Sequence, residues 1–177
     1  MPTNEAISSE EQSMNGPSPA PIIEMATAYW QSATLIAATR LELFSKLADG
    51  KNTVSSLADA LSANEEMTDM LLTALLSLGL VERYDNRYRN SGLADAFLVE
   101  GKPGYLGPAL AYNGDVFELW GKLGDVILSG APQEAPSEYL GDDDARTRNF
   151  VYGMHHRALA VGRAVIAEMN FEGAKKL

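Results

Sequence analysis

The chain has no cysteine, only two histidines and no long uninterrupted apolar run among its 177 residues. Without cysteine there are no disulfides, thiolate metal sites or thiol nucleophiles, which fits a reducing cytoplasm. No apolar run approaches the roughly eighteen residues of a membrane-spanning helix, and no basic stretch followed by an apolar block marks a secretory signal. These absences predict a cytoplasmic protein that does not enter a membrane.

Positive charge is also scarce. The sequence has 14 basic and 24 acidic residues, giving a formal net charge of -10. Nucleic acid is therefore an unfavourable partner, because neutralising phosphates is the largest sequence-independent part of nucleic-acid affinity. Hydrophobic residues make up 46% of the chain, enough for a substantial core, so we expect one domain with an appendage.

Residue types divide the sequence into three regions. Residues 1–21 are rich in Ser, Glu, Asn and Pro and predict a flexible tail, because burial there cannot offset the entropy of ordering. Residues 22–100 predict a winged-helix-like region that serves dimerisation, and residues 101–177 predict further helices. The expected fold class is mainly α, with one small β-hairpin.

The winged-helix prediction rests on residues 53–89. A helix over 53–61 is followed by Asn64, the expected N-cap of a longer helix that ends at Gly79. The longer helix carries an apolar stripe at helical spacing, made of Met67, Met70, Leu71, Ala74, Leu75 and Leu78. "LVERYDNRYR" then predicts two short strands that turn at Asp85 and Asn86.

This order of elements is that of a winged-helix DNA-binding domain, but the segment carries negative charge where such a domain needs positive charge. Residues 52–82 contain no Lys or Arg, and their acidic residues are Asp59, Glu65, Glu66, Asp69 and Glu82. A recognition helix needs donors for phosphate and guanine, which Arg or Lys most often supplies. We therefore expect a packing scaffold that binds no nucleic acid. A winged-helix transcriptional regulator and a stand-alone dimerisation module are the alternatives.

Long helices are expected on both sides of this region. Residues 22–47 predict one continuous helix that is apolar around much of its circumference and needs two partners. One further helix carries a face from Leu106 to Ile127. A last helix begins at the acidic residues 142–144 and has an apolar line that consists of Phe150, Met154, Ala158, Val161, Val165 and Met169.

The run from "LELFSKLADGK" through "LVERYDNRYRNSGLADAFL" to the closing "NFEGAKKL" carries a family resemblance. Residues 28–177 resemble the N-terminal dimerisation and substrate-lid domain of the S-adenosylmethionine-dependent O-methyltransferases of the caffeate and hydroxyindole type. "NFEGAKKL" is similar to the lead-in to that family's first nucleotide-binding strand. The resemblance implies that the Rossmann-like cofactor domain is absent from this chain, which is then a piece of a longer enzyme or a natural truncation.

The resemblance also implies site residues and partners. It implies a homodimer through the helix of residues 25–47, from Met25 to Leu47, and neighbouring helices; a central core helix is the alternative. Phe150 and Met154 match a Phe and a Met of the family's acceptor pocket, with core packing as the alternative. The remaining candidates for acceptor binding are Tyr112, Asn113, Trp120 and His155.

Two of these candidates leave questions open. Trp120 also fits plain burial, which we expect for it. The family places a His three residues beyond the pocket Met, whereas this sequence has Arg157 there, preceded by His155 and His156. The polar contact to the acceptor is therefore open.

Methyl transfer to a hydroxyl needs a bound sulfonium donor, an aligned acceptor oxygen and usually a base. In similar enzymes the catalytic His lies outside the region that this chain resembles. The two histidines present are helix neighbours about 100° apart, so they do not converge on a metal or a proton. We expect S-adenosylmethionine to bind the full-length enzyme and not this chain, which is predicted to be inactive alone. The expected acceptor is a small aromatic or polyketide-like molecule.

Overall fold

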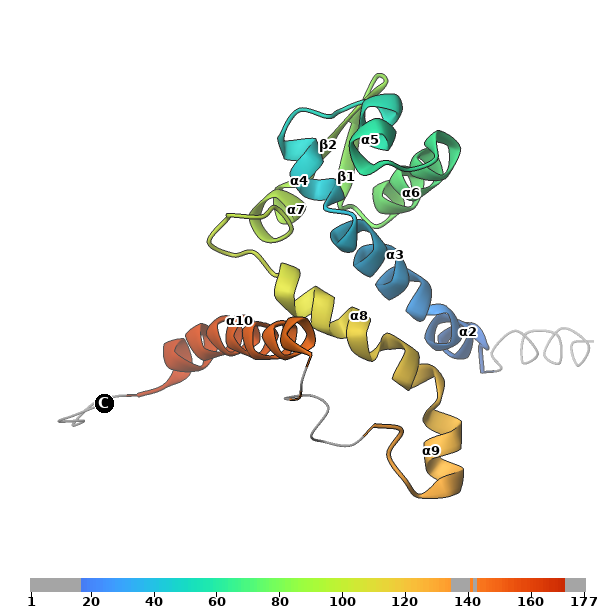
Figure 1. The fold of residues 1–177 in the computed structure, drawn as a ribbon, viewed down its shortest axis with the longest axis vertical. Coiled ribbons are helices and arrows are strands. Elements are labelled where there is room, and N and C mark those ends of the chain that lie inside the picture. Colours follow the sequence, from blue (N-terminus) through green and yellow to red (C-terminus); the bar gives the residue numbers. More distant parts are fainter. Residues whose placement is uncertain (1–16, 135–140, 142, 171–177) are drawn as a thin grey trace, which may run out of the picture. The chain divides into compact units, whose positions relative to one another are not determined.

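The computed structural model describes residues 17–134, 141 and 143–170 (Figure 1). Most of the predicted tail, and most of the segment NFEGAKKL that resembles the lead-in to a nucleotide-binding strand, lie in residues 1–16 and 171–177, outside the described residues. The chain divides after Ser32 into two units. The first contains helix α2 (Ala20–Thr27), which Pro19 and Pro21 begin, and the first turn of helix α3 (Tyr29–Arg40).

The second unit opens with the winged-helix-like region. It contains helix α4 (Leu43–Ala48), helix α5 (Val54–Leu61) and helix α6 (Glu65–Ser77). Thr53 caps α5 in a reciprocal capping box with Ser56, and the Asn64 side chain accepts from the Met67 amide at the start of α6. The predicted helices over 53–61 and from Asn64 are confirmed.

The hairpin follows α6 directly. Gly79, with φ 67°, reverses the chain after α6. Strand β1 (Val81–Tyr84) then pairs antiparallel with strand β2 (Arg87–Asn90), with Val81 opposite Asn90 and Tyr84 opposite Arg87. Asp85, at φ 54°, occupies the turn as predicted, and the short helix α7 (Gly92–Phe97) closes the region.

The core of the unit lies within this region (Figure 1). The largest side chains without solvent exposure are Leu43, Phe44, Leu57, Leu72 and Leu75. They come from α4, α5 and α6, and β1 and β2 add Val81 and Tyr88. The mainly α fold class with a small hairpin is confirmed.

The apolar stripe predicted for α6 is rotated in the structure. Met67 is 53% exposed and Met70 is 62% exposed, whereas Thr68, Leu72 and Leu75 are buried. Thr68 tolerates burial because its hydroxyl donates to the Asn64 carbonyl at 2.8 Å. The buried face of α6 is therefore rotated by about one residue from the face predicted from the sequence.

The prediction of one continuous helix over residues 22–47 was wrong. The segment forms α2, α3 and α4, with a short interruption at Ala28 and a sharp one at Leu41 and Glu42. Glu42 has φ 56°, in the left-handed region, and so ends the α3 geometry before α4 begins. This turn directs Leu43, Phe44 and Leu47 into the core.

The last helices form an arm outside the winged-helix core. Helix α8 (Gly107–Gly121) is followed by helix α9 (Leu123–Ser129) and, after the connecting loop, by helix α10 (Asp144–Glu168). The single helix predicted from Leu106 to Ile127 is wrong, because the chain breaks at Lys122 between two glycines, Gly121 and Gly124. Asp143 caps α10, in agreement with the predicted acidic start.

Helices α8 and α10 lie side by side where they cross (Figure 1). A Cβ atom at Gly153 of α10 would stand only 3.2 Å from the Cα atom of Ala109 on α8. The crossing therefore depends on the missing side chain. Beyond it the predicted apolar line of α10 turns outward, since Val161 is 62% exposed. Within the part of the chain that the structure describes, no helix combines the length and apolarity needed to span a membrane.

Candidate functional site

Two aromatic rings meet at the crossing of α8 and α10. The ring of Tyr112 on α8 and the ring of Phe150 on α10 lie 5.3 Å apart between centroids, at 65° between planes. Both side chains are half-buried. This edge-to-face arrangement is favourable, and both side chains remain partly accessible to solvent. Two of the sequence-predicted acceptor residues are therefore brought into contact.

A polar contact joins Asn113, the neighbour of Tyr112, to a residue about two helical turns beyond Phe150 on α10. The Arg157 guanidinium on α10 donates through Nη2 to the Asn113 Oδ1 atom on α8, and its Cζ atom lies 6.0 Å from the Tyr112 ring centroid. The predicted residue Asn113 thus joins the aromatic pair through Arg157. The helix crossing creates this link, so the spacing of residues along the sequence gave no signal of it.

A second polar node holds the crossing from the other side. Asp115 on α8 accepts from Asn149 on α10 at 3.1 Å and pairs with Arg40 on α3 at 3.4 Å. A Cβ atom at Gly114 would meet the Arg40 guanidinium at 2.6 Å, so this glycine makes room for the arginine. These contacts tie both helices of the arm to α3, and the sequence prediction missed Arg40, Asp115 and Asn149.

Met154 and the histidines follow Phe150 along α10. Met154 is half-buried one turn beyond Phe150, whereas His155 is exposed. His156 is half-buried, and its Nδ1 atom is buried without a hydrogen-bond partner among the described residues. The two imidazole centroids lie 5.8 Å apart at 56°. No group of three His, Asp or Glu side chains suited to a metal ion occurs in the described ranges.

Trp120 differs from its sequence prediction. The side chain is 71% exposed, so the expected burial was wrong. Trp120 lies two turns beyond Tyr112 near the end of α8, about 12 Å along the helix axis at 1.5 Å per residue. Within this chain it therefore does not join the aromatic pair.

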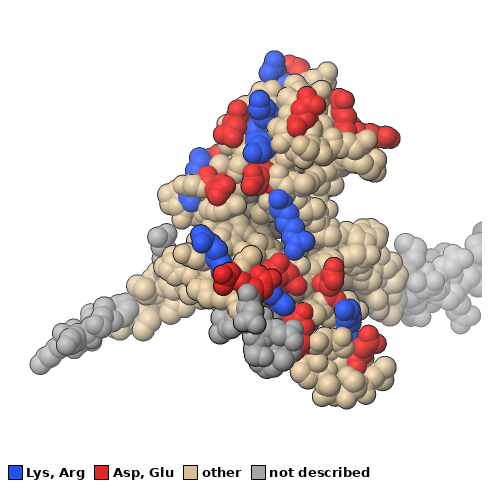
Figure 2. Space-filling view, in the orientation of Figure 1, with Lys and Arg blue, Asp and Glu red and all other residues tan. Residues whose placement is uncertain are grey.

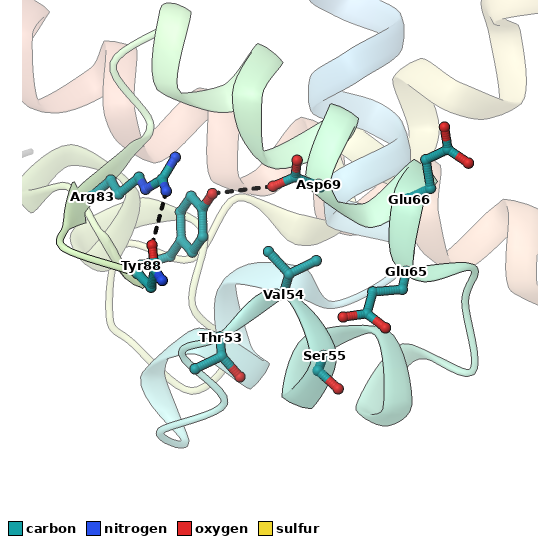
Figure 3. Close-up of a pocket in the computed structure, with 9 residues that line it drawn as sticks. Thr53, Val54, Ser55, Glu65, Glu66, Asp69, Arg83 and Tyr88 are labelled. Carbon is teal, nitrogen blue, oxygen red and sulfur yellow. Dashed lines mark hydrogen bonds between the residues drawn. The ribbon is translucent and has the colours of Figure 1, made fainter.

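The winged-helix region has a cavity of its own, of about 760 Å³. Figure 3 shows Glu65, Glu66 and Asp69 of α6 along its rim, with Asp69 hydrogen-bonded to the Tyr88 hydroxyl at 3.3 Å. Arg83 is the one basic residue in this lining. Burial raises the pKa of the Tyr88 phenol; Arg83 opposes this shift and Asp69 adds to it.

Three carboxylates against one guanidinium repel a phosphate backbone. Figure 2 shows acidic and basic side chains interspersed over this region, with no continuous basic surface on the face in view. The hairpin cations are also engaged locally: Arg89 pairs with Glu82 at 2.7 Å and lies over the Tyr84 ring. This surface does not favour nucleic-acid binding.

The family model for the O-methyltransferase dimerisation domain matches residues 23–100. Residues 23–100 are an O-methyltransferase dimerisation domain. The match covers most of α2, all of α3 to α7 and the hairpin, and it confirms the family resemblance of the sequence.

Curated relatives extend the similarity beyond the dimerisation domain. The chain is 28% identical over 163 residues to 3-hydroxy-5-methyl-1-naphthoate 3-O-methyltransferase of Streptomyces sahachiroi, covering 90% of this chain and 47% of that protein. It is 33% identical over 135 residues to N,N-dimethyltransferase OxyT of Streptomyces rimosus, covering 71% of this chain and 39% of that protein. The chain thus spans less than half the length of these relatives.

Solved structures agree on the fold. The chain superposes on human N-acetylserotonin methyltransferase, solved in complex with S-adenosylmethionine, with a TM-score of 0.73 and 23% identity. The match covers 89% of this chain and 50% of that chain. The dimerisation domain and the arm that follows it therefore share one arrangement with that protein.

Proposed function

We propose that this chain is the dimerisation and acceptor-binding portion of an S-adenosylmethionine-dependent O-methyltransferase that acts on a small aromatic or polyketide-like molecule. The observation that carries the proposal is the dimerisation domain at residues 23–100, followed by an arm that presents paired aromatic rings. The naphthoate methyltransferase named above supports an aromatic acceptor. The absence of cysteine supports a cytoplasmic location.

The cofactor is proposed for the full-length enzyme. Among the described residues the strands form only a hairpin, and no strand leads through a glycine-rich turn into a helix, which is the setting that cradles such a cofactor. These residues therefore do not fit S-adenosylmethionine by themselves. When bound elsewhere in the enzyme, S-adenosylmethionine supplies the methyl group, and the role of this chain is to hold and orient the acceptor.

The dimer interface is proposed to lie on α2 and the first part of α3. Large apolar side chains there are exposed, with Ile22 at 68%, Met25 at 71% and Trp30 at 59%. Clustered exposure of this kind marks an association surface. We propose that the interface ends before Leu43, short of the Leu47 expected from the sequence, because Leu43, Phe44 and Leu47 are already buried in the chain's own core.

The second unit has an apolar groove of its own along the later part of α3. It has a volume of about 430 Å³ between α3 and α8, and it is lined mainly by Ala33, Ile36, Ala37, Leu41 and Phe117. The groove lies beside Arg40 and Gly114. A second subunit seated there would contact the same helices that position the acceptor residues, which links dimerisation to acceptor binding.

Sedimentation equilibrium tests the proposed dimer with two matched methionines. Met25→Glu on α2 is expected to weaken dimerisation at least about tenfold, because a charge would enter a desolvated interface. Met70→Glu is the control, since Met70 is 62% exposed on α6, within the winged-helix region. A wild-type chain that stays monomeric, or equal weakening by both substitutions, would contradict the proposal.

The cofactor assignment has its own test. S-adenosylmethionine should not raise the melting temperature of this chain, whereas it should stabilise the full-length enzyme by mass action. Retention of duplex DNA by this chain in a low-salt mobility-shift assay would favour the transcriptional alternative instead.

A further inference from the structure

One cation of the arm lies beside the aromatic pair and forms no ion pair with any residue that the structure describes. Arg157 is exposed on α10, donates to the Asn113 amide oxygen and lies over the Tyr112 ring. Tyr112 in turn packs edge-to-face on Phe150. An arginine held by an amide and an aromatic face has a restricted set of orientations, so less entropy is lost when it binds a further group.

The guanidinium has donors left for such a group. It carries five N–H donors, and the described contacts use one of them on Asn113. No carboxylate of the described residues forms an ion pair with Arg157. Asp115 on α8 is the acid nearest in sequence to Asn113, and it is already engaged by Arg40 and Asn149.

Resting on the acceptor-binding role proposed above, we propose that Arg157 selects an aromatic acceptor that carries a carboxylate. The ring of such an acceptor packs against the solvent-accessible parts of the half-buried Tyr112 and Phe150 side chains, and its carboxylate accepts from the remaining donors of Arg157. Planar guanidinium and carboxylate groups form bidentate hydrogen bonds, which fix both the orientation and the position of the acceptor ring. Arg157 is then a specificity-determining residue, and Asn113 positions it.

The same helix offers a matched arginine. Arg148 is also exposed on α10 and also lies over a tyrosine, with its Cζ atom 5.1 Å from the Tyr152 ring centroid. The described contacts do not link it to Asn113 or to the Tyr112–Phe150 pair. Arg148→Gln therefore removes the same charge from the same helix without touching the proposed site.

The test is an NMR titration of this chain with two ligands that differ only in a carboxylate group and the neutral carboxamide that replaces it. A hydroxynaphthoate and the corresponding neutral hydroxynaphthamide have the same rings and hydroxyl. Signals of the Tyr112 ring, the Met154 methyl and the Arg157 Nε–H group report binding. We expect the hydroxynaphthoate to bind about three- to tenfold more tightly than the amide, the range of a partly exposed charge-assisted contact.

Variants assign this preference to a residue. Arg157→Gln should make the two ligands bind equally, while Arg148→Gln should retain the wild-type preference. Arg157→Lys keeps the charge but not the planar fork, so it should retain part of the preference. Unchanged Leu72 methyl signals in each variant show that the core has folded.

The outcomes separate this inference from the proposed function. Equal binding of both ligands to the wild type, or a preference that survives Arg157→Gln, would overturn the carboxylate selectivity and leave the acceptor-binding role intact. Absence of shifts at Tyr112 and Met154 with either ligand would overturn both.

Discussion

The winged-helix region and the α8–α10 arm are stabilised in different ways. In the winged-helix region, large side chains such as Phe44, Leu57 and Leu72 are completely buried within the chain. In the arm, the buried positions are small, such as Ala109 and Gly153, and large side chains such as Trp120 point to solvent. The first region has a core of large apolar side chains, whereas the second leaves many of its large apolar side chains in solvent.

This difference follows from what each region can bury. Burial of a large apolar side chain contributes about 1.5–3 kcal/mol, so the winged-helix core can hold itself together. The arm gains mainly close backbone approach and two polar nodes. Its exposed apolar side chains include Ile127 at 72% and Leu128 at 88%, which fits helices completed by a second subunit or by further enzyme structure.

The largest expected effect comes from truncating one leucine in each region. Leu72→Ala should lower the free energy of unfolding by about 2–5 kcal/mol, because it leaves a cavity in a packed core. Leu128→Ala should change it by less than about 0.5 kcal/mol, since that side chain already lies in solvent. Urea unfolding at a protein concentration too low for association measures both. Similar losses would remove the contrast between the regions.

A smaller effect is expected where the arm helices cross. Gly153→Leu should destabilise α10 by about 1–3 kcal/mol, because the new side chain meets the α8 backbone at Ala109. Gly162→Leu is the control on the same helix, where a Cβ atom meets nothing within 4 Å, and it should stabilise α10 slightly through better helix propensity.

Amide hydrogen exchange of α10 measures this prediction for both variants. The Tyr112–Phe150 ring contact, followed by nuclear Overhauser effects, should be lost in Gly153→Leu alone. Equal protection of α10 in the two variants would show that the close crossing does not hold the arm.

The smallest expected change in the free energy of unfolding concerns the Tyr88 hydroxyl in the winged-helix region, and it depends on pH. Tyr88→Phe should cost about 0.5–1.5 kcal/mol at neutral pH through the lost hydrogen bond to Asp69. The pKa of Tyr88 is raised from 10.0, so its stabilising contribution is complete below about pH 10 and is lost as the pH rises through the folded-state value.

The wild type should therefore lose stability relative to Tyr88→Phe above pH 10, as measured by urea unfolding across pH. Tyr84→Phe, at the exposed end of the hairpin, serves as the control and should follow the wild-type decline. A constant difference between the wild type and Tyr88→Phe up to pH 12 would contradict the assignment to Tyr88.

Local signals predicted the winged-helix region well. Thr53, Asn64 and Gly79 act through hydrogen bonds or backbone angles within a few residues, so the sequence carries their effect directly. The break at Glu42 has no such signal, because glutamate, unlike the aspartate Asp85, is not enriched in the left-handed region; packing of the α4 side chains into the core determines it. The rotated face of α6 has the same origin: its neighbours decide which apolar side is buried.

The candidate site was predictable only along each helix. The sequence placed Phe150 and Met154 on one helix and Tyr112 and Asn113 on another, which are α10 and α8 in the structure. The roles of these four residues in acceptor binding stay a prediction. The contact between Arg157 and Asn113 depends on the crossing of two helices that are 44 residues apart at this point. No pattern within one helix specifies that crossing. The close approach that makes a glycine necessary at position 153 is visible only once the two helices are packed together.

Folding and association meet within helix α3. With α2, its first part exposes large apolar side chains such as Met25 and Trp30, whereas Ala38 near its end is buried in the same core as Phe44 and Leu47. If α2 and the first part of α3 meet a second subunit as proposed, substitutions there alter how strongly subunits join, and substitutions between Ala38 and Leu47 alter whether each subunit folds. The two properties can then vary independently along one stretch of sequence.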